Sequence, residues 1–313
     1  MRGPSVTGTV YWGVNNIFTV KPDGMEPVEC RLKGKVLKDV EDVYNPLSPG
    51  DRVEIDLDPG HAGKAMILAR RARKNAYSRW NKKRQCPQTL AANLDLLVLV
   101  TSPASPPFRP RFLDRALIMA QREELPILIL VNKCDQGLTG EVEDRLATYQ
   151  GLDWDVHLCS AATGEGIEEL QRHLAGLTSA FVGQSGVGKS SLLNILHKDS
   201  RQRIGEISSK YNRGSHTTSF SLLFPWPSGE GGVIDTPGVR ELEVFGVDPA
   251  QLAFLYPDFS PYLGQCAFSL CTHLQEPGCA VLKALEAGDI HPDRWENYQK
   301  LFLELKESGT RWT

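Results

Sequence analysis

The sequence has no long apolar run, it carries little net charge, and its cysteines are odd in number. The first and the last of these features each argue against a class of protein. No apolar stretch among its 313 residues approaches the ~20 that a membrane-spanning helix needs. No hydrophobic segment typical of a signal peptide follows Met1, so we expect a cytoplasmic protein without a membrane partner. The seven cysteines are odd in number and mostly scattered, which argues against a disulfide framework. The net charge of −3 says little about nucleic acid, because the distribution of charge matters more than its sum.

What is present is an ordinary globular composition, with 41% hydrophobic and 23% charged residues. At ~150 residues per domain, the length suggests two domains or three small ones. Residues 5–70 contain short β-branched or aromatic runs, separated by turn signals such as Asp58-Pro59-Gly60. About five strands in such a segment predict a small β-barrel. It is either an OB-fold, the common nucleic-acid-binding type, or a barrel that serves as a protein adaptor.

The junction that follows is strongly basic. Residues 70–84 hold eight Lys or Arg side chains and no acid, with Tyr77 and Trp80 interleaved. Cations neutralise phosphates and aromatic rings can stack on unpaired bases, so we interpret this stretch as an RNA-facing patch. A solvated basic linker is the alternative.

The chain is organised around a phosphate-binding loop that fits the pattern G-x-x-x-x-G-K-[ST]. A short apolar run at 180–182 precedes the loop and an apolar helical pattern follows from 191 to 197, which is the strand–loop–helix context that such a motif requires. Lys189 is expected to contact the β- and γ-phosphates, and the Ser190 hydroxyl to bind Mg²⁺. The candidate residues are Gly183, Gln184, Ser185, Gly186, Val187, Gly188, Lys189, Ser190 and Ser191.

A second motif, Asn132-Lys133-Cys134-Asp135, follows a buried apolar run at 127–131. A carboxylate at Asp135 can accept hydrogen bonds from the ring N–H and the amino group of guanine, a donor pair that adenine lacks. Asn132 is expected to support the loop and the base, and the stem of Lys133 to lie over the face of the base. Further along, small residues at 160–166 allow a backbone N–H to approach the guanine O6. The candidates in that loop are Ser160, Ala161 and Ala162.

Two further segments are expected to hold Mg²⁺. Thr217 and Thr218 lie in the polar stretch 214–219, and one of their hydroxyls would complete the metal shell when a γ-phosphate is present. Asp235 ends a short apolar run, Gly232-Val233-Ile234, and would hold the metal through water. The amide of Gly238, three residues on, would sense the γ-phosphate.

The five motifs are those of guanine-nucleotide hydrolases, in an unusual order. The two base-reading motifs come first and the phosphate loop, the threonine segment and Asp235-Thr236-Pro237-Gly238 follow, which is a circular permutation. The glutamine that commonly orients the attacking water after the last motif is absent. His216, beside the threonines, is the best substitute as a catalytic group, and a structural role for it is the alternative.

Near the C-terminus the spacing C-x₄-C-x-H-x₅-C predicts a structural zinc site with three thiolates and one imidazole. Helical patterns at 280–287 and 292–307 surround it, and a subdomain of this size often needs a metal for stability. The predicted ligands are Cys266, Cys271, His273 and Cys279.

The chain resembles the ribosome small-subunit-dependent GTPase A family (RsgA, also called YjeQ or YloQ) along nearly its whole length. The matches lie at residues 91–95, 132–135, 183–191, 214–218, 235–241, 271–273 and 276–280. The resemblance implies an α/β fold with an OB-fold barrel at 1–72, a basic linker at 73–90, a circularly permuted P-loop GTPase domain at 91–248 and a mostly helical zinc domain at 249–313. It also implies a GTP- and GDP-binding monomer that docks on the small (30S) subunit and its 16S rRNA during late maturation, with hydrolysis stimulated by that subunit.

Two other functions remain open at this stage. One is a nucleotide-gated rRNA-binding module whose hydrolysis is vestigial. The other is a P-loop enzyme for a small molecule, which the base-reading motifs and the lack of an obvious substrate domain disfavour.

Overall fold

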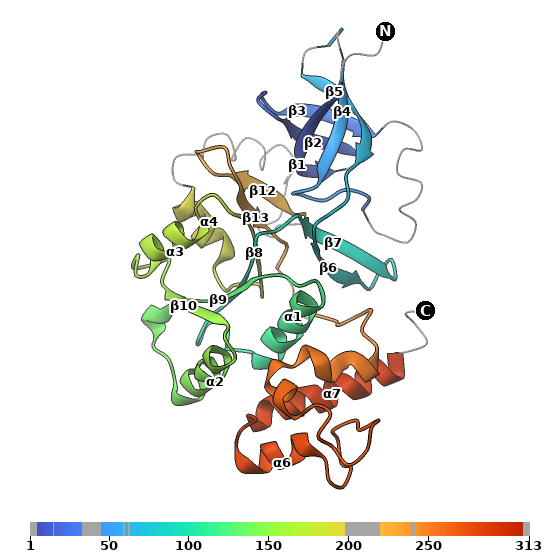
Figure 1. Cartoon of the computed structure of the whole chain (residues 1–313). Helices are drawn as coiled ribbons and strands as arrows, with labels where there is room; N and C mark the ends of the chain where they lie inside the picture. Colours follow the sequence, from blue (N-terminus) through green and yellow to red (C-terminus); the bar gives the residue numbers. More distant parts are fainter. Residues whose placement is uncertain are drawn as a thin grey trace.

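The computed structural model describes residues 5–14, 16–32, 45–58, 60–61, 63–197, 220–238 and 242–308. Within these ranges three regions follow one another along the chain: a barrel, a mixed sheet with helices on both faces, and a helical C-terminal segment (Figure 1). None of the helices in the described ranges combines the length and apolarity that crossing a bilayer requires.

The N-terminal barrel is closed, which confirms the expected small β-barrel. Its order is β1-β2-β3-β5-β4, and the one parallel pair is β3 with β5. Side chains alternate between its interior and its surface, and Val10, Phe18, Ile55 and Ile67 are among those in its own apolar cluster. The strands are β1 (Val6–Val14), β2 (Ile17–Pro22), β3 (Val28–Leu32), β4 (Arg52–Leu57) and β5 (Lys64–Arg70).

The basic junction forms an antiparallel hairpin of β6 (Ala76–Asn81) and β7 (Cys86–Ala92), which lies between the barrel and the main sheet (Figure 1). The expectation that both of its aromatic residues serve base stacking is wrong for Tyr77, whose side chain is fully buried in the core of the main sheet. The ring of Trp80 packs against that of Phe245, and the two ring centroids are 5.7 Å apart. The hairpin therefore contributes to the core as well as carrying charge.

The central sheet has the order β10-β9-β8-β11-β13-β12, with all pairs parallel except β12 with β13. Strand β9, which leads to the predicted base-reading motif, comes before β11, which leads to the predicted phosphate loop, so the sheet carries the permuted order that the motifs indicate. Its strands are β8 (Leu96–Thr101), β9 (Ile127–Asn132), β10 (Asp155–Cys159), β11 (Thr178–Gly183), β12 (Leu222–Pro225) and β13 (Gly232–Asp235).

Helices cover both faces of this sheet because its central strands alternate between two apolar clusters. In β8, Leu97 and Leu99 face the cluster that includes α1 and α2, whereas Leu96, Val98 and Val100 face the cluster that includes α3 and α4. The helices are α1 (Pro110–Arg122), α2 (Gly140–Gly151), α3 (Ile167–Leu174) and α4 (Lys189–Leu196).

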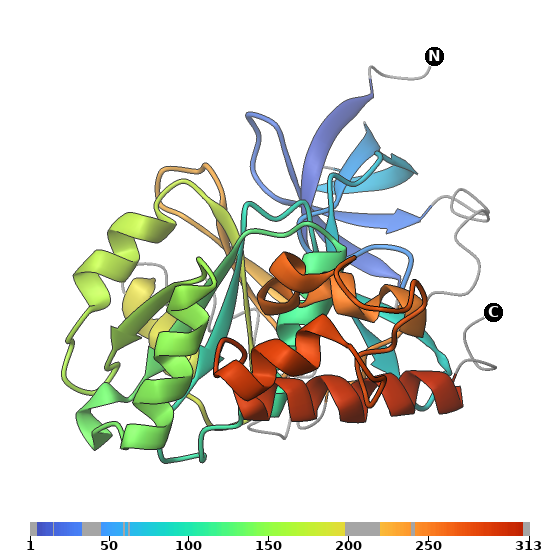
Figure 2. The same ribbon diagram turned by 60° about the horizontal axis from the view of Figure 1, so that its bottom comes forward.

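The C-terminal segment packs on the α1 side of the sheet, where α7 contacts α1 (Figure 2). Its buried residues, among them Val281, Tyr298, Leu301 and Phe302, belong to the same apolar cluster as α1. The segment comprises the 3₁₀ helices η3 (Pro249–Leu255) and η4 (Pro257–Tyr262) and the helices α6 (Ala280–Ala287) and α7 (Pro292–Ser308). It therefore shares one core with the sheet, whereas the barrel has a core of its own.

Candidate nucleotide site and metal centre

The phosphate loop joins the end of β11 to the start of α4, as predicted. Gly188 has φ +97°, and a Cβ there would lie 2.2 Å from the side-chain nitrogen of Asn132. A Cβ on Gly183 would lie 2.2 Å from the carbonyl oxygen of Val100. Both positions therefore require glycine, one for its backbone angle and both for the close approach of a neighbour.

Lys189 is buried at the first turn of α4, with 7% of its surface exposed. Its Nζ donates to the carbonyl oxygens of Gly183 at 2.8 Å and Gln184 at 3.1 Å, so the ammonium lies inside the curve of the loop. Burial lowers the pKa of this ammonium, while the nearby carboxylate of Asp235 opposes that shift. A buried cation held by two backbone carbonyls is suited to a multiply charged phosphate group.

Asn132, at the end of β9, connects three motifs that are far apart in the sequence. Its Nδ2 donates to the carbonyl oxygen of Val187 in the phosphate loop at 2.8 Å. Its Oδ1 accepts from the amide of Ala161 at 3.0 Å. Only 1% of the residue is exposed, so both bonds are shielded from water. The sequence suggested that Asn132 supports its own loop, but gave no sign of the bond to the phosphate loop.

Lys133 makes a second connection to the phosphate loop. Its Nζ donates to the carbonyl oxygens of Gly186 at 2.8 Å and Ser105 at 2.6 Å. Its backbone is left-handed, with φ +67°, which turns the chain sharply after β9. The contact with Ser105 could not be predicted from the sequence, because any residue can supply a backbone carbonyl.

The carboxylate of Asp135, the predicted base-reading group, is oriented by the loop after β10. The hydroxyl of Ser160 donates to Oδ1 of Asp135, and it accepts from the amides of Ala162 at 3.2 Å and Thr163 at 3.1 Å. Ser160 is fully buried while Asp135 is exposed. The structure thus brings the two predicted guanine motifs together and leaves the carboxylate accessible to a ligand.

On the phosphate side, Asp235 ends β13 and is 6% exposed, close enough to Lys189 for its charge to raise the pKa of that ammonium. A Cβ on Gly238 would lie 3.2 Å from the Cα of Ser185, so the last residue of that motif lies against the phosphate loop. Ser190 is exposed in the first turn of α4. The predicted residues His216, Thr217 and Thr218 lie outside the described residues.

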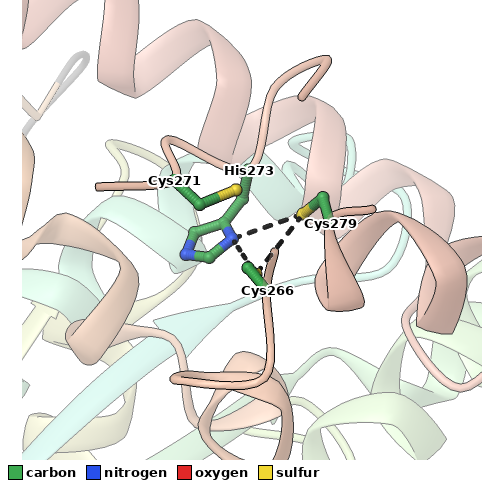
Figure 3. A group of neighbouring side chains, drawn as sticks. All are labelled: Cys266, Cys271, His273 and Cys279. Atoms are coloured by element: carbon green, nitrogen blue, oxygen red, sulfur yellow. Dashed lines mark hydrogen bonds between the residues drawn. The ribbon is translucent and has the colours of Figure 1, made fainter. Parts of the chain in front are cut away.

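The four predicted zinc ligands meet in one cluster, where their ligand atoms all lie within 4.8 Å of one another (Figure 3). Cys266 Sγ is 3.6 Å from His273 Nδ1 and 3.9 Å from Cys279 Sγ, and the latter two atoms are 3.4 Å apart. A tetrahedron with Zn–S of about 2.3 Å and Zn–N of about 2.1 Å has edges of about 3.6 to 3.8 Å. Desolvation raises the pKa of the Cys271 thiol to about 12, so a cation is needed to keep it ionised. The cluster fits zinc.

The surrounding backbone is fixed by the C-terminal helices. Desolvation alone would raise the pKa of Glu276, but hydrogen bonds from the Thr272 side chain and from backbone amides, including that of Gln275, lower it to about 2. The indole of Trp295 donates to the carbonyl of His273 at 3.0 Å, and the Tyr298 hydroxyl to that of Thr272 at 2.8 Å. These bonds hold the ligand loop against α7.

The comparisons with known proteins agree with this geometry. The family model described as RsgA GTPase matches residues 70–245. A protein named small ribosomal subunit biogenesis GTPase RsgA from Chlorobaculum parvum is 39% identical over 310 residues, covering 97% of this chain and 99% of that protein. A protein of the same name from Borrelia recurrentis is 38% identical over 303 residues, covering 96% of this chain and 95% of that protein. This chain belongs to the RsgA GTPase family.

Two solved structures of such proteins show the same architecture. The chain matches the crystal structure of YjeQ from Thermotoga maritima with a TM-score of 0.73 and 32% identity, over 96% of this chain and 99% of that one. It also matches the structure of YloQ, described as a circularly permuted GTPase, with a TM-score of 0.71 and 26% identity. That match covers 98% of this chain and 96% of the YloQ chain. The family membership makes the chain a GTP hydrolase with a circularly permuted P-loop domain.

Proposed function

We propose that this chain is a GTPase that binds the small (30S) ribosomal subunit and couples GTP hydrolysis to late maturation of the subunit and to its own release. The observation that carries the proposal is Asn132, whose two hydrogen bonds tie the base-reading loops to the phosphate loop in one site. The names of the relatives supply the ribosomal context. The site is expected to bind GTP and GDP with Mg²⁺, in a cytoplasmic, monomeric protein.

In this mechanism water attacks the γ-phosphate in line, and catalysis comes from positioning and charge stabilisation. Ser190, Asp235 and one of Thr217 and Thr218 would hold Mg²⁺, which would neutralise negative charge on the phosphates. Lys189 stabilises charge on the β- and γ-phosphates. We assign the orientation of the water to His216.

We assign the 16S rRNA contact in part to the tip of the β6–β7 hairpin. Lys82, Lys83 and Arg84 are all exposed there, at the turn between the strands. Lys82 lies 3.8 Å from Glu243 but its side chain stays 64% exposed, whereas Arg73 is held by a mostly buried ion pair with Asp51 at 2.7 Å. The charge of the tip is therefore the part of the basic junction best able to meet phosphates.

The first test is GTP hydrolysis with and without purified small subunits, with ATP as the nucleotide control. Stimulation by the subunit that is confined to GTP is the expected result. Bound GTP without stimulation would instead favour the nucleotide-gated rRNA-binding module.

The base-reading assignment is tested with Asp135→Asn. The amide offers guanine a mismatched donor, so the variant is expected to lose its preference for GTP over xanthosine triphosphate. An unchanged preference in nucleotide competition would refute the assignment.

The water-orienting assignment is tested with His216→Ala. We expect loss of subunit-stimulated turnover with nucleotide affinity unchanged. Full stimulated turnover in the variant would remove His216 from the mechanism.

A further inference from the structure

Two of the four predicted zinc ligands lie in one short turn, residues 271–276, and a single carboxylate closes this turn. Oε1 of Glu276 accepts from the amide of Thr272 at 2.8 Å and from the hydroxyl of the same residue. Its Oε2 accepts from the amides of Leu274 at 3.0 Å and Gln275 at 3.1 Å. The carboxylate therefore receives four hydrogen bonds from the segment that presents the ligands.

Two carbonyls of the turn have partners on α7. The indole of Trp295 donates to the carbonyl of His273 at 3.0 Å, and the hydroxyl of Tyr298 donates to that of Thr272 at 2.8 Å. Tyr298 is buried in the apolar cluster that α7 shares with the sheet, and Trp295 packs against the same cluster, so both donors are themselves fixed. The turn thus satisfies these backbone groups with protein partners and needs no metal to do so.

The histidine of the turn has a left-handed backbone, with φ +59° at His273. A residue other than glycine keeps this conformation only where its surroundings impose it. Here Glu276 holds the amides on both sides of the histidine, and Trp295 holds its carbonyl. In this conformation Nδ1 of His273 lies 3.4 Å from Sγ of Cys279, on the far side of the cluster (Figure 3).

We propose that Glu276 is a positioning residue for the metal, which holds the turn in its ligating form before zinc binds. In many small metal domains the site forms only with the ion, so that the binding free energy is spent on folding. Here the bonds to Glu276 and to α7 order the turn in advance. Glu276 is not among the four residues whose ligand atoms lie within 4.8 Å of one another, so it acts through the turn and not on the ion. The inference rests on the zinc assignment of the cluster and not on the ribosomal function.

The first test is competition for zinc between the full-length protein and a chelator of known affinity. Glu276→Gln keeps the size of the side chain but places an amino group against backbone N–H donors, so we expect zinc to bind about tenfold or more weakly. The matched control Glu286→Gln makes the same change at an exposed position of α6 and should bind zinc as the parent does. Equal affinities for the two variants would overturn the role of Glu276, and a parent that binds no zinc would overturn the metal assignment.

The second test asks whether the turn exists without the ion. Amide hydrogen exchange of the zinc-stripped protein should be slow at Thr272, Leu274 and Gln275 in the parent and in Glu286→Gln, and faster in Glu276→Gln. Exchange in the zinc-stripped parent as fast as in Glu276→Gln would refute a turn formed in advance.

A third measurement separates positioning from ligation and from loss of the fold. At saturating Co²⁺ the absorption bands of Glu276→Gln should match those of the parent, because the four ligands remain; altered bands would make Glu276 a ligand and overturn the proposal. If Glu276→Gln does not fold, Thr272→Val decides, since it removes only the hydroxyl donor. We expect Thr272→Val to weaken zinc binding severalfold, and parent affinity in that variant would count against the proposal.

Discussion

The GTPase sheet is joined to the barrel on one side and to the C-terminal segment on the other, and the two junctions differ in kind. The barrel keeps a separate apolar cluster, whereas the C-terminal helices continue the cluster of α1 and α2. A separate core can remain folded when its junction opens, but a shared core cannot be divided without exposing apolar surface. The structure therefore predicts two cooperative units, the barrel and the sheet together with the C-terminal helices, where the sequence suggests three successive regions.

The barrel junction depends on one buried ion pair and close backbone contact. Asp51 is fully buried and accepts from Arg73 through both oxygens, at 2.7 and 2.8 Å. A Cβ on Gly50 would lie 2.0 Å from the carbonyl oxygen of Ala92, which brings the barrel directly against the end of β7. Phe220 reaches the barrel as well, its ring centroid 6.3 Å from that of Trp12.

The C-terminal junction is a buried polar network centred on Asp114 of α1. This carboxylate accepts from Arg145 at 2.6 Å, Arg294 at 2.8 Å and Tyr149 at 2.9 Å. Arg294 also donates to both oxygens of Asp258, at 2.6 and 3.0 Å. The two aspartates balance the two arginines, so removing one member leaves another charge buried without a partner.

The largest effect is therefore expected from Asp114→Ala. Because Arg145 and Arg294 lose their common partner inside the core, the free energy of unfolding should fall by about 3 to 5 kcal/mol. Denaturant unfolding should show the sheet and the C-terminal helices melting together at a lower midpoint. Asp144→Ala is the matched control, since its carboxylate is 70% exposed and pairs with His291 at 3.0 Å. The free energy of unfolding should fall by less than about 1 kcal/mol in this variant. Separate transitions for sheet and helices would contradict the shared core.

Asp51→Ala should weaken the junction between the barrel and the sheet by about 3 kcal/mol, which is the upper part of the usual cost of an unsatisfied buried group. The cost should not exceed this, because the Arg73 side chain is 17% exposed and regains some contact with water. Limited proteolysis should release the barrel while GTP binding by the remainder persists. Asp23→Ala serves as the control, because its ion pair with Arg52 is exposed on the barrel surface. Loss of nucleotide binding together with barrel release would show that the junction is not separable.

The sequence predicted what is local in the chain. The loop at 183–191 was predictable because strand and helix patterns flank it within a few residues, and the zinc ligands because they lie within fourteen positions, 266 to 279. The small barrel followed from alternating short strands and turns. Each of these signals depends on spacing alone, which the printed sequence contains.

The junctions could not be predicted in the same way. Asp114 and Arg294 are 180 residues apart, and each looks like an ordinary solvent-facing charge on an amphipathic helix. The bond from Asn132 to Val187 crosses 55 residues, and no pattern indicates which carbonyl an amide will reach. Tyr77 was misread because a tyrosine among eight basic residues suggests an exposed stacking ring, whereas its strand turns it inward.

Between pH 6.5 and 4, acid should act through His197 on the unit formed by the sheet and the C-terminal helices. Burial lowers the pKa of His197 to about 4, and its ring stacks on that of Trp226 at 4.8 Å on the α4 face of the sheet. The unfolded chain binds a proton near pH 6.5 and the folded one does not, so stability falls as the pH drops from about 6.5 to about 4. At pH 5 the loss should be about 2 kcal/mol. His197→Phe should flatten this dependence in urea unfolding, and an unchanged pH profile would exclude His197 as its source.

The smallest effect is expected at the contact between Trp80 of the β6–β7 hairpin and Phe245. Trp80 and Phe245 pack with centroids 5.7 Å apart, and the guanidinium of Arg122 lies 5.0 Å from the Phe245 ring. A double-mutant cycle with Trp80→Ala and Phe245→Ala should give a coupling energy of about 1 kcal/mol.

The aromatic pair Tyr149 and Trp154, at 5.8 Å, is the control because it lies beside the C-terminal network, where Tyr149 donates to Asp114. Both pairs should show similar coupling in stability, but only loss of the Trp80 contact should also change GDP affinity, since Phe245 follows the motif that ends at Gly238. If GDP affinity is equal in both cycles, the hairpin stabilises the shared core without reporting on the nucleotide. The position of Trp80 between the barrel and the sheet would then serve packing alone, and signals from the barrel would have to reach the site through other contacts, such as Asp51 with Arg73 or Trp12 with Phe220.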